Sequence, residues 1–234
     1  MKLSNHFGSA FRTFAVILAA CLFSGCDKDD DSVYPNVLTD FMDLYTNGES
    51  TVDRIHPDTS SSPLTLLNRL SGEGLQPDTT YRAVGMYRLP DEKGETAVYS
   101  VTLIYAEPPF KPHEGMKVVT DPLYLESVSR GGNYLNIVVQ PMMQTKPHSY
   151  AFVEDSVVNI NGHKMLYLTL AHNQNGDRES FPRHVYLSAP LKSYGFTDGD
   201  SISLRVNVYD KGVKEWRGGH LPPPPPPPPR AAPC

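Results

Sequence analysis

The chain has 234 residues, with 21 lysines and arginines against 26 aspartates and glutamates, a formal net charge of −5 at pH 7. An acidic chain argues against a nucleic-acid-binding protein, because such proteins gather basic residues against the phosphate backbone. The three cysteines are Cys21, Cys26 and Cys234, so no pair lies within the body of the chain and no disulfide is expected there. Stability must therefore come from packed apolar cores.

The first 25 residues have the organisation of a signal peptide. Lys2 and Arg12 supply the only charges, and residues 14–23 are apolar. This run is roughly half of the 20 residues that a membrane-spanning helix needs, which favours a cleaved signal over a permanent span. The motif Phe23-Ser24-Gly25-Cys26 resembles the lipobox of bacterial lipoproteins, although leucine is usual in place of Phe23. We predict a lipoprotein signal peptide at residues 1–25 and acylation of Cys26; an ordinary secretory signal or a buried cysteine are the alternatives.

An acidic tether, residues 26–32, follows the signal. Its Lys28, Asp29 and Asp30 resemble the surface-export signal of lipoproteins in one Gram-negative phylum, and they predict display on the outer face of the outer membrane. A solvated charged tether is the simpler alternative. Without residues 1–25, 19 basic and 26 acidic residues remain, a net charge of about −7.

The first half of the body, residues 33–110, has the pattern of short β-strands separated by turn residues. Strands are predicted at residues 33–42, 51–55, 80–89 and 98–106. Residues 64–70 fit either a strand or a helical turn. Residues 98–106 are apolar on both faces, so we expect a central strand there.

A run with three prolines, residues 107–115, divides the chain because neither helix nor sheet continues through it. The second half, residues 111–218, repeats the β pattern with longer strands. They are predicted at residues 134–140, 150–153, 156–160, 165–170, 184–189 and 201–208, with a tight hairpin at Asn161-Gly162. The last of these points four apolar residues inward: Ile202, Leu204, Val206 and Val208. This pattern predicts an antiparallel two-layer β-sandwich.

The tail, residues 219–234, contains eight consecutive prolines at positions 222–229. A polyproline II rod offered to a partner is one interpretation. A reading-frame slip or assembly error is the preferred one, because the composition changes abruptly after a final strand expected at residues 212–217. The tail is therefore taken as disordered or artefactual.

The sequence contains no established catalytic motif: no Gly-x-Ser-x-Gly elbow, no His-Glu-x-x-His and no phosphate-binding loop. We therefore predict a non-enzymatic protein without a cofactor. His163, His172 and His184 could meet across adjacent strands as a metal site, but chance proximity explains them better, so no metal ligand is assigned. Residues 172–177 alternate oxygen-bearing side chains as a calcium loop does, but a plain Asn-Gly turn accounts for them.

Two further groups of residues can be explained either by a function or by their structural role. Four tyrosines of the first half could form a sugar-stacking surface: Tyr81, Tyr87, Tyr99 and Tyr105. Tyrosines in sheets, however, usually pack against neighbours and leave the hydroxyl solvated. The acidic pair Glu154-Asp155 is expected in a solvated turn.

Several stretches in a characteristic order resemble the NigD-like lipoproteins. They are residues 34–40, 166–177, 185–188 and 199–210, which together span most of the predicted mature body. The resemblance implies an N-terminal OB-like β-barrel at residues 33–110 and a C-terminal β-sandwich at residues 111–218. It also implies a role in bacteriocin immunity, and it carries no catalytic residues over to this chain.

Three functional hypotheses from different classes remain open. The first is a surface-exposed, non-enzymatic lipoprotein of the immunity type, and the second is a glycan-binding accessory of an outer-membrane uptake system. The third is a hydrolase whose site is assembled from scattered carboxylates. The expected partners are the membrane, through the N-terminal lipid, and an extracellular protein or glycan; nucleic acid is not expected.

Overall fold

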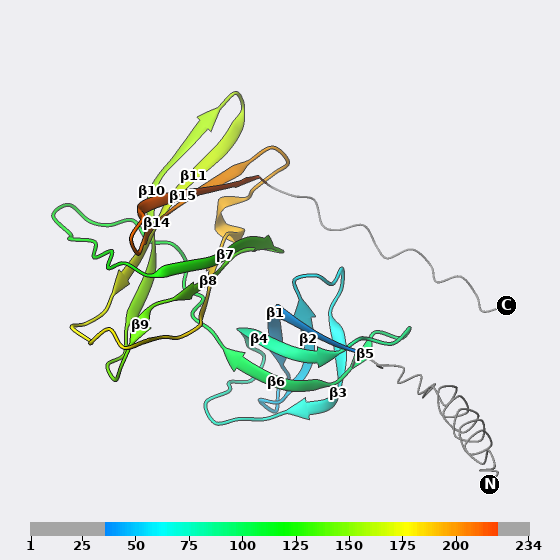
Figure 1. Ribbon diagram of the computed structural model, residues 1–234. Coiled ribbons are helices and arrows are strands. Elements are labelled where there is room, and N and C mark those ends of the chain that lie inside the picture. Colours follow the sequence, from blue (N-terminus) through cyan, green and yellow to red (C-terminus); the bar gives the residue numbers. More distant parts are fainter. Residues whose placement is uncertain (1–35, 220–234) are drawn as a thin grey trace, which may run out of the picture. The chain divides into compact units, whose positions relative to one another are not determined.

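The computed structural model describes residues 36–219, and this part of the chain is all-β, as the sequence predicts (Figure 1). It contains fifteen strands and one short 3-10 turn, η1 (Lys192–Tyr194), and no α-helix within the described range. No helix between residues 36 and 219 has the length and hydropathy needed to cross a bilayer.

Six strands form the N-terminal sheet, in the spatial order β5-β3-β2-β1-β4-β6. They are β1 (Val37–Thr46), β2 (Val52–Pro57), β3 (Leu64–Leu70), β4 (Thr80–Arg88), β5 (Glu95–Thr96) and β6 (Val98–Leu103). The ambiguous residues 64–70 are thus a strand. The first strand, β1, continues to Thr46, beyond the predicted end at residue 42. Residues 33–35 of that prediction lie outside the described part of the chain.

The N-terminal sheet buries one of its own faces, which a single sheet achieves only by curling. Its core contains nine buried side chains: Met42, Leu44, Val52, Ile55, Leu64, Leu66, Ala83, Tyr87 and Val98. One continuous segment connects the two outer strands of the curled sheet: β5 pairs with β3, β6 pairs with β4, and only Ala97 lies between β5 and β6. The side chain of Asn68 in β3 also contacts this segment: Nδ2 donates to Val98 O at 2.7 Å and Oδ1 accepts from Val98 N at 2.9 Å. The sheet is therefore a curled, OB-like half-barrel.

The prediction of a central strand at residues 98–106 is wrong. β6 is the terminal strand of its sheet, and only Val98 within it is buried, while Tyr99 is 57% exposed. The end of the predicted strand contacts the sandwich instead. Tyr105 forms a parallel bridge with Leu187, and its carbonyl accepts a hydrogen bond from Ser188 N at 2.9 Å, so the segment after β6 attaches to the sandwich.

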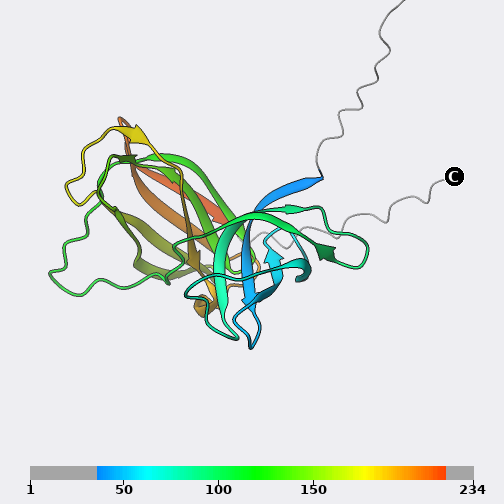
Figure 2. The same cartoon turned by 90° about the horizontal axis from the view of Figure 1, so that it is seen from below.

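Two sheets form the sandwich (Figures 1 and 2). The four-stranded sheet has the order β10-β11-β14-β15, and the three-stranded sheet has the order β13-β8-β7. Their strands are β7 (Tyr124–Gly131), β8 (Tyr134–Gln140), β10 (Ser149–Ile160), β11 (His163–Asn173), β13 (Val185–Pro190), β14 (Ser201–Val208) and β15 (Gly212–Gly219). A two-stranded ribbon pairs β9 (Met142–Met143) with β12 (Phe181–Pro182).

The core between the two sheets contains the alternating residues that the sequence predicts. Leu135, Ile137 and Val139 from β8 face the leucines of β11 and the four predicted apolar residues of β14. Each of these side chains is at most 7% exposed. Asn161 and Gly162 both have positive φ, 52° and 87°, and close the β10–β11 hairpin with the predicted type of turn.

Two details of the sandwich differ from the prediction. β11 and β14 run parallel, because the chain crosses to the other sheet as β13 before it returns, so the sandwich is antiparallel except at this pair. The two strands expected at residues 150–153 and 156–160 are one strand, β10, interrupted by a bulge between Glu154 and Ser156.

A buried polar network joins the N-terminal sheet to the sandwich. Arg82 of β4 is 6% exposed; its Nη1 donates to Asp43 Oδ1 at 3.1 Å and its Nη2 to Asp58 Oδ2. Nη2 also donates to Asn136 Oδ1 at 3.0 Å, and Nε donates to Ser188 Oγ at 3.3 Å. The guanidinium thus binds two carboxylates from the N-terminal sheet and two polar side chains from the sandwich.

Neighbouring contacts fix this network in place. The Arg82 guanidinium lies 3.8 Å from the ring centroid of Tyr134, a cation–π contact. Gly131 lies so close to Asp58 that a Cβ atom there would collide with the carboxylate. Phe41 and Tyr186 pack edge to face with ring centroids 6.0 Å apart. The two β modules are therefore connected by side-chain packing as well as by the chain itself, and the boundary predicted near residue 110 stays a prediction.

Candidate functional site

The predicted lipid-attachment and export residues lie outside the described part of the chain. These are Cys26, Lys28, Asp29 and Asp30, and the polyproline run at residues 222–229 is outside it as well. Their assignments stay predictions.

The three histidines considered as a metal site do not converge. His163 and His172 begin and nearly end the same strand, nine residues apart, which separates them by about 30 Å at roughly 3.3 Å per residue. His184 is exposed and instead contacts Glu126 Oε2 at 3.0 Å. Within residues 36–219, no group of three or more His, Cys, Asp or Glu side chains is placed to hold a metal ion.

The four tyrosines of the first half do not share a surface. Tyr87 is buried in the core of the N-terminal sheet, and Tyr81 is half-buried with its hydroxyl 2.7 Å from Gln76 N. The expectation of a solvated acidic pair is wrong for Glu154. Glu154 lies two residues after Phe152 and pairs with Leu168, both core residues, so its side chain points inward. It is 8% exposed and accepts a hydrogen bond from Tyr194 OH at 2.6 Å.

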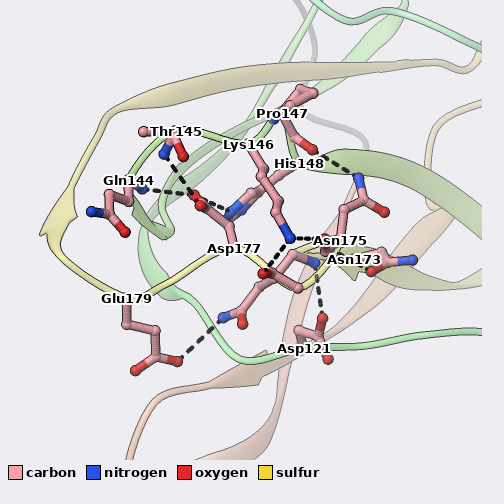
Figure 3. Close-up of polar contacts among 12 residues, drawn as sticks. Asp121, Gln144, Thr145, Lys146, Pro147, His148, Asn173, Asn175, Asp177 and Glu179 are labelled. Carbon is pink, nitrogen blue, oxygen red and sulfur yellow. Dashed lines mark hydrogen bonds and ion pairs between the residues drawn. The ribbon is translucent and has the colours of Figure 1, made fainter.

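Two loops at one end of the sandwich are tied together by the carboxylate of Asp177 (Figure 3). Asp177 Oδ2 accepts from Gln144 N at 2.7 Å, and Oδ1 accepts from Thr145 N at 3.2 Å. Lys146 Nζ donates in return to Gly176 O at 2.9 Å. These backbone hydrogen bonds lower the pKa of Asp177 well below its usual range. The carboxylate is occupied by amides of its own chain, which supports the plain turn over a calcium loop at residues 172–177.

A pair of buried imidazoles lies next to these loops. His148 Nδ1 is 2.9 Å from His172 Nε2, and His172 Nδ1 is 2.9 Å from the carbonyl oxygen of Asp121. Because a carbonyl only accepts, His172 must carry its proton on Nδ1, and its Nε2 then accepts from His148. His148 Nε2 lies 3.5 Å from Asp177 Oδ2, which places the imidazole pair against the Asp177 carboxylate. Tyr150 stacks on His172 with ring planes at 7°.

An open pocket of about 230 Å³ adjoins the imidazoles. The three-proline run and the segment that follows it pass beside β10 and β11. Phe110, Met116 and Val118 from this stretch line the pocket together with Ala151 and Ala171. His172 also lines it. Both nitrogens of His172 are engaged, however, so this imidazole has no free position from which to act as a general base. The pocket is suited to binding an apolar group.

Sequence reasoning identified residues 172–177 but missed His148, Tyr150, Asp121 and the pocket. One signal was available: His172 continues the inward alternation of Leu166, Leu168 and Leu170 along β11. A residue two positions beyond an inward leucine shares its face, so the histidine had to enter the end of the core. Its partners come from segments distant in sequence, and no local pattern indicates them.

The buried imidazole should make folding stability depend on pH. Burial is the main cause that lowers the pKa of His172, and the neighbouring His148 lowers it further. The unfolded chain, with a histidine pKa of about 6.5, then binds the proton more readily than the folded chain does. We expect the free energy of unfolding, measured in urea, to fall as pH drops from 7.5 to 5.5.

The His172→Asn variant should show a flatter dependence over the same pH range, whatever its absolute stability. His113→Asn is the matched control, since His113 is exposed, and it should keep the dependence of the original protein. An unchanged slope in His172→Asn would contradict this assignment.

Comparison with known proteins identifies the sandwich. Residues 108–217 match the family model of the NigD-like C-terminal beta sandwich domain. A solved structure of a NigD-like immunity protein from Bacteroides caccae is 25% identical with a TM-score of 0.62, and the match covers 80% of this chain and 93% of that one. No curated protein matches the chain significantly.

Two further solved structures are similar in fold. A proposed toxin-related protein from Parabacteroides distasonis is 17% identical with a TM-score of 0.61, covering 79% of this chain and 93% of that one. A proposed lipoprotein from Bacteroides fragilis is 14% identical with a TM-score of 0.52, covering 79% and 97%. Residues 108–217 are therefore a NigD-like C-terminal beta sandwich domain, and the chain as a whole is similar to a solved NigD-like immunity protein.

Proposed function

We propose that this protein is a non-enzymatic lipoprotein of the immunity type, exposed at the cell surface, that protects its cell by binding an extracellular protein. The observation that carries this proposal is the likeness to the Bacteroides caccae NigD-like immunity protein, which extends over 80% of this chain.

The geometry of the pocket supports binding of a protein side chain. Its volume of about 230 Å³ is below the roughly 300–1,000 Å³ usual for small-molecule sites, and its lining is mainly apolar. A pocket of this size suits one apolar side chain, the kind of anchor that dominates the energy of many protein interfaces. The Asp177 contacts hold the adjoining loops in one arrangement, so little entropy is lost when a partner binds.

The proposed membrane anchor is inferred from the sequence of the N-terminal residues. Acylation at Cys26 would tie the chain to the outer membrane, and Lys28, Asp29 and Asp30 would direct it to the outer face. Multiple acyl chains give stable attachment, because each buried methylene contributes about 0.8 kcal/mol. Immunity requires this location if the toxin or its receptor is met before the toxin enters the cell.

Deleting the gene should sensitise the cell to a bacteriocin from a neighbouring strain. Restoring the original gene should return resistance, whereas the Cys26→Ala variant should neither incorporate labelled fatty acid nor restore resistance. The measurements are the bacteriocin concentration that halves growth and the incorporation of labelled palmitate. A deletion strain as resistant as its parent would reject the immunity role.

A second variant separates anchoring from display. Replacement of Lys28, Asp29 and Asp30 by alanine should leave lipidation intact and remove the protein from the reach of protease added to whole cells. Cleavage equal to that of the original protein would show that these three residues are only a solvated tether.

A further inference from the structure

Two tyrosine rings meet beside the Asp177 loop. Tyr124 begins β7 and Tyr209 follows β14, and their ring centroids lie 4.9 Å apart with the planes inclined at 38°. The amide of Tyr209 donates to the carbonyl of Leu123 at 3.2 Å, which holds the two residues side by side. Tyr124 is 44% exposed, so the pair presents an aromatic surface to solvent.

Polar side chains from the neighbouring loop border this surface. Tyr209 OH donates to Glu179 Oε1 at 2.5 Å, and Gln174 Nε2 donates to the same hydroxyl at 3.1 Å and to the same carboxylate at 3.3 Å. Burial and the Glu179 carboxylate raise the pKa of Tyr209, which keeps its hydroxyl a donor at neutral pH.

The loop that carries Gln174 and Glu179 is itself held in place. Gln174 N donates to Asp121 Oδ2 at 2.8 Å, and the Asp177 contacts fix the residues between Gln174 and Glu179 (Figure 3). The aromatic surface and its polar border therefore form one prearranged unit.

We propose that Tyr124, Tyr209, Gln174 and Glu179 bind a neutral pyranose sugar. One face of a pyranose ring carries mainly C–H groups, which pack on the electron-rich face of a tyrosine. The hydroxyls at its edge both donate and accept, which matches a carboxylate acceptor and a side-chain amide. This site goes beyond the proposed immunity role, which requires no sugar.

The geometry disfavours two other ligands. A cation held between aromatic rings needs space between them, and the rings of Tyr124 and Tyr209 are in mutual contact. An acidic sugar would be repelled by Glu179 and by the formal net charge of −5. An uncharged ring that has an apolar C–H face and hydroxyl groups at its edge fits the aromatic surface and its polar border.

Affinity electrophoresis of the mature lipoprotein tests the proposal, in a detergent without a sugar headgroup. The probes are the neutral polysaccharides dextran, laminarin, mannan, galactan and xylan, cast separately into native gels. At least one should slow the migration of the protein, and Tyr124→Ala should weaken that binding at least tenfold. Tyr124→Phe, which keeps the ring, should bind as the original protein does.

Tyr99→Ala is the matched control, since Tyr99 is similarly exposed but lies in the N-terminal sheet, and it should leave the retardation unchanged. The melting temperature of Tyr124→Ala distinguishes a lost contact from a lost fold, and Glu179→Gln gives a second, gentler test of the polar border. Retardation by none of the five polysaccharides, or full retardation of a folded Tyr124→Ala, would overturn the proposal. Bacteriocin resistance should persist in Tyr124→Ala, so the two proposals can fail separately.

Discussion

Arg82→Ala should lower the free energy of unfolding by about 3–5 kcal/mol, the usual cost of removing one partner from a buried ion pair. The substitution leaves the carboxylates of Asp43 and Asp58 without their cation, and their side chains are only 17% and 10% exposed. It also removes the hydrogen bonds from the guanidinium to Asn136 and Ser188, which are part of the contact between the N-terminal sheet and the sandwich. Urea unfolding at pH 7 measures the change.

Arg54→Ala is the matched control for this prediction. Arg54 is also an arginine of the N-terminal sheet with an aspartate partner, but its side chain is 57% exposed. Exposed ion pairs contribute about 0–1 kcal/mol, so this variant should unfold close to the original protein. Equal effects of the two substitutions would contradict a buried network at Arg82.

Val206→Asp should unfold the sandwich or nearly so. Val206 is 2% exposed in the core between the two sheets. The substitution removes a buried apolar side chain and places a carboxylate without a partner there, which together cost about 4 kcal/mol or more. That is a large share of the 5–15 kcal/mol by which domains are usually stable. Thermal unfolding followed by circular dichroism measures the loss.

The same change at an exposed valine separates burial from β-propensity. Val213 lies on the neighbouring strand, β15, and is 65% exposed, so Val213→Asp should shift the melting temperature by only a few degrees. If Val206→Asp melts as high as Val213→Asp, then Val206 does not face the core.

The sequence by itself determined the strands whose alternation is strict. The inward leucines of β11 and the apolar residues of β14 could be assigned because residues two apart on a strand share a face. Asn161-Gly162 predicted its hairpin because both positions need positive φ, which these residues tolerate. The resemblance to NigD-like proteins was likewise carried by the order of short stretches along the chain, and the family model and the solved structure agree with it.

Tertiary structure alone decided which outward faces become covered. Alternation places Arg82 opposite Ala83, on the outer face of β4, but only the arrival of Asn136 and Ser188 from the sandwich makes that position buried. The candidate site depends on the same effect, since His148, His172 and Asp121 come from three separate segments. Local sequence fixes the direction in which a side chain points, because backbone geometry repeats every two residues. It does not fix what meets that side chain, because that depends on strand pairings between residues far apart in the chain.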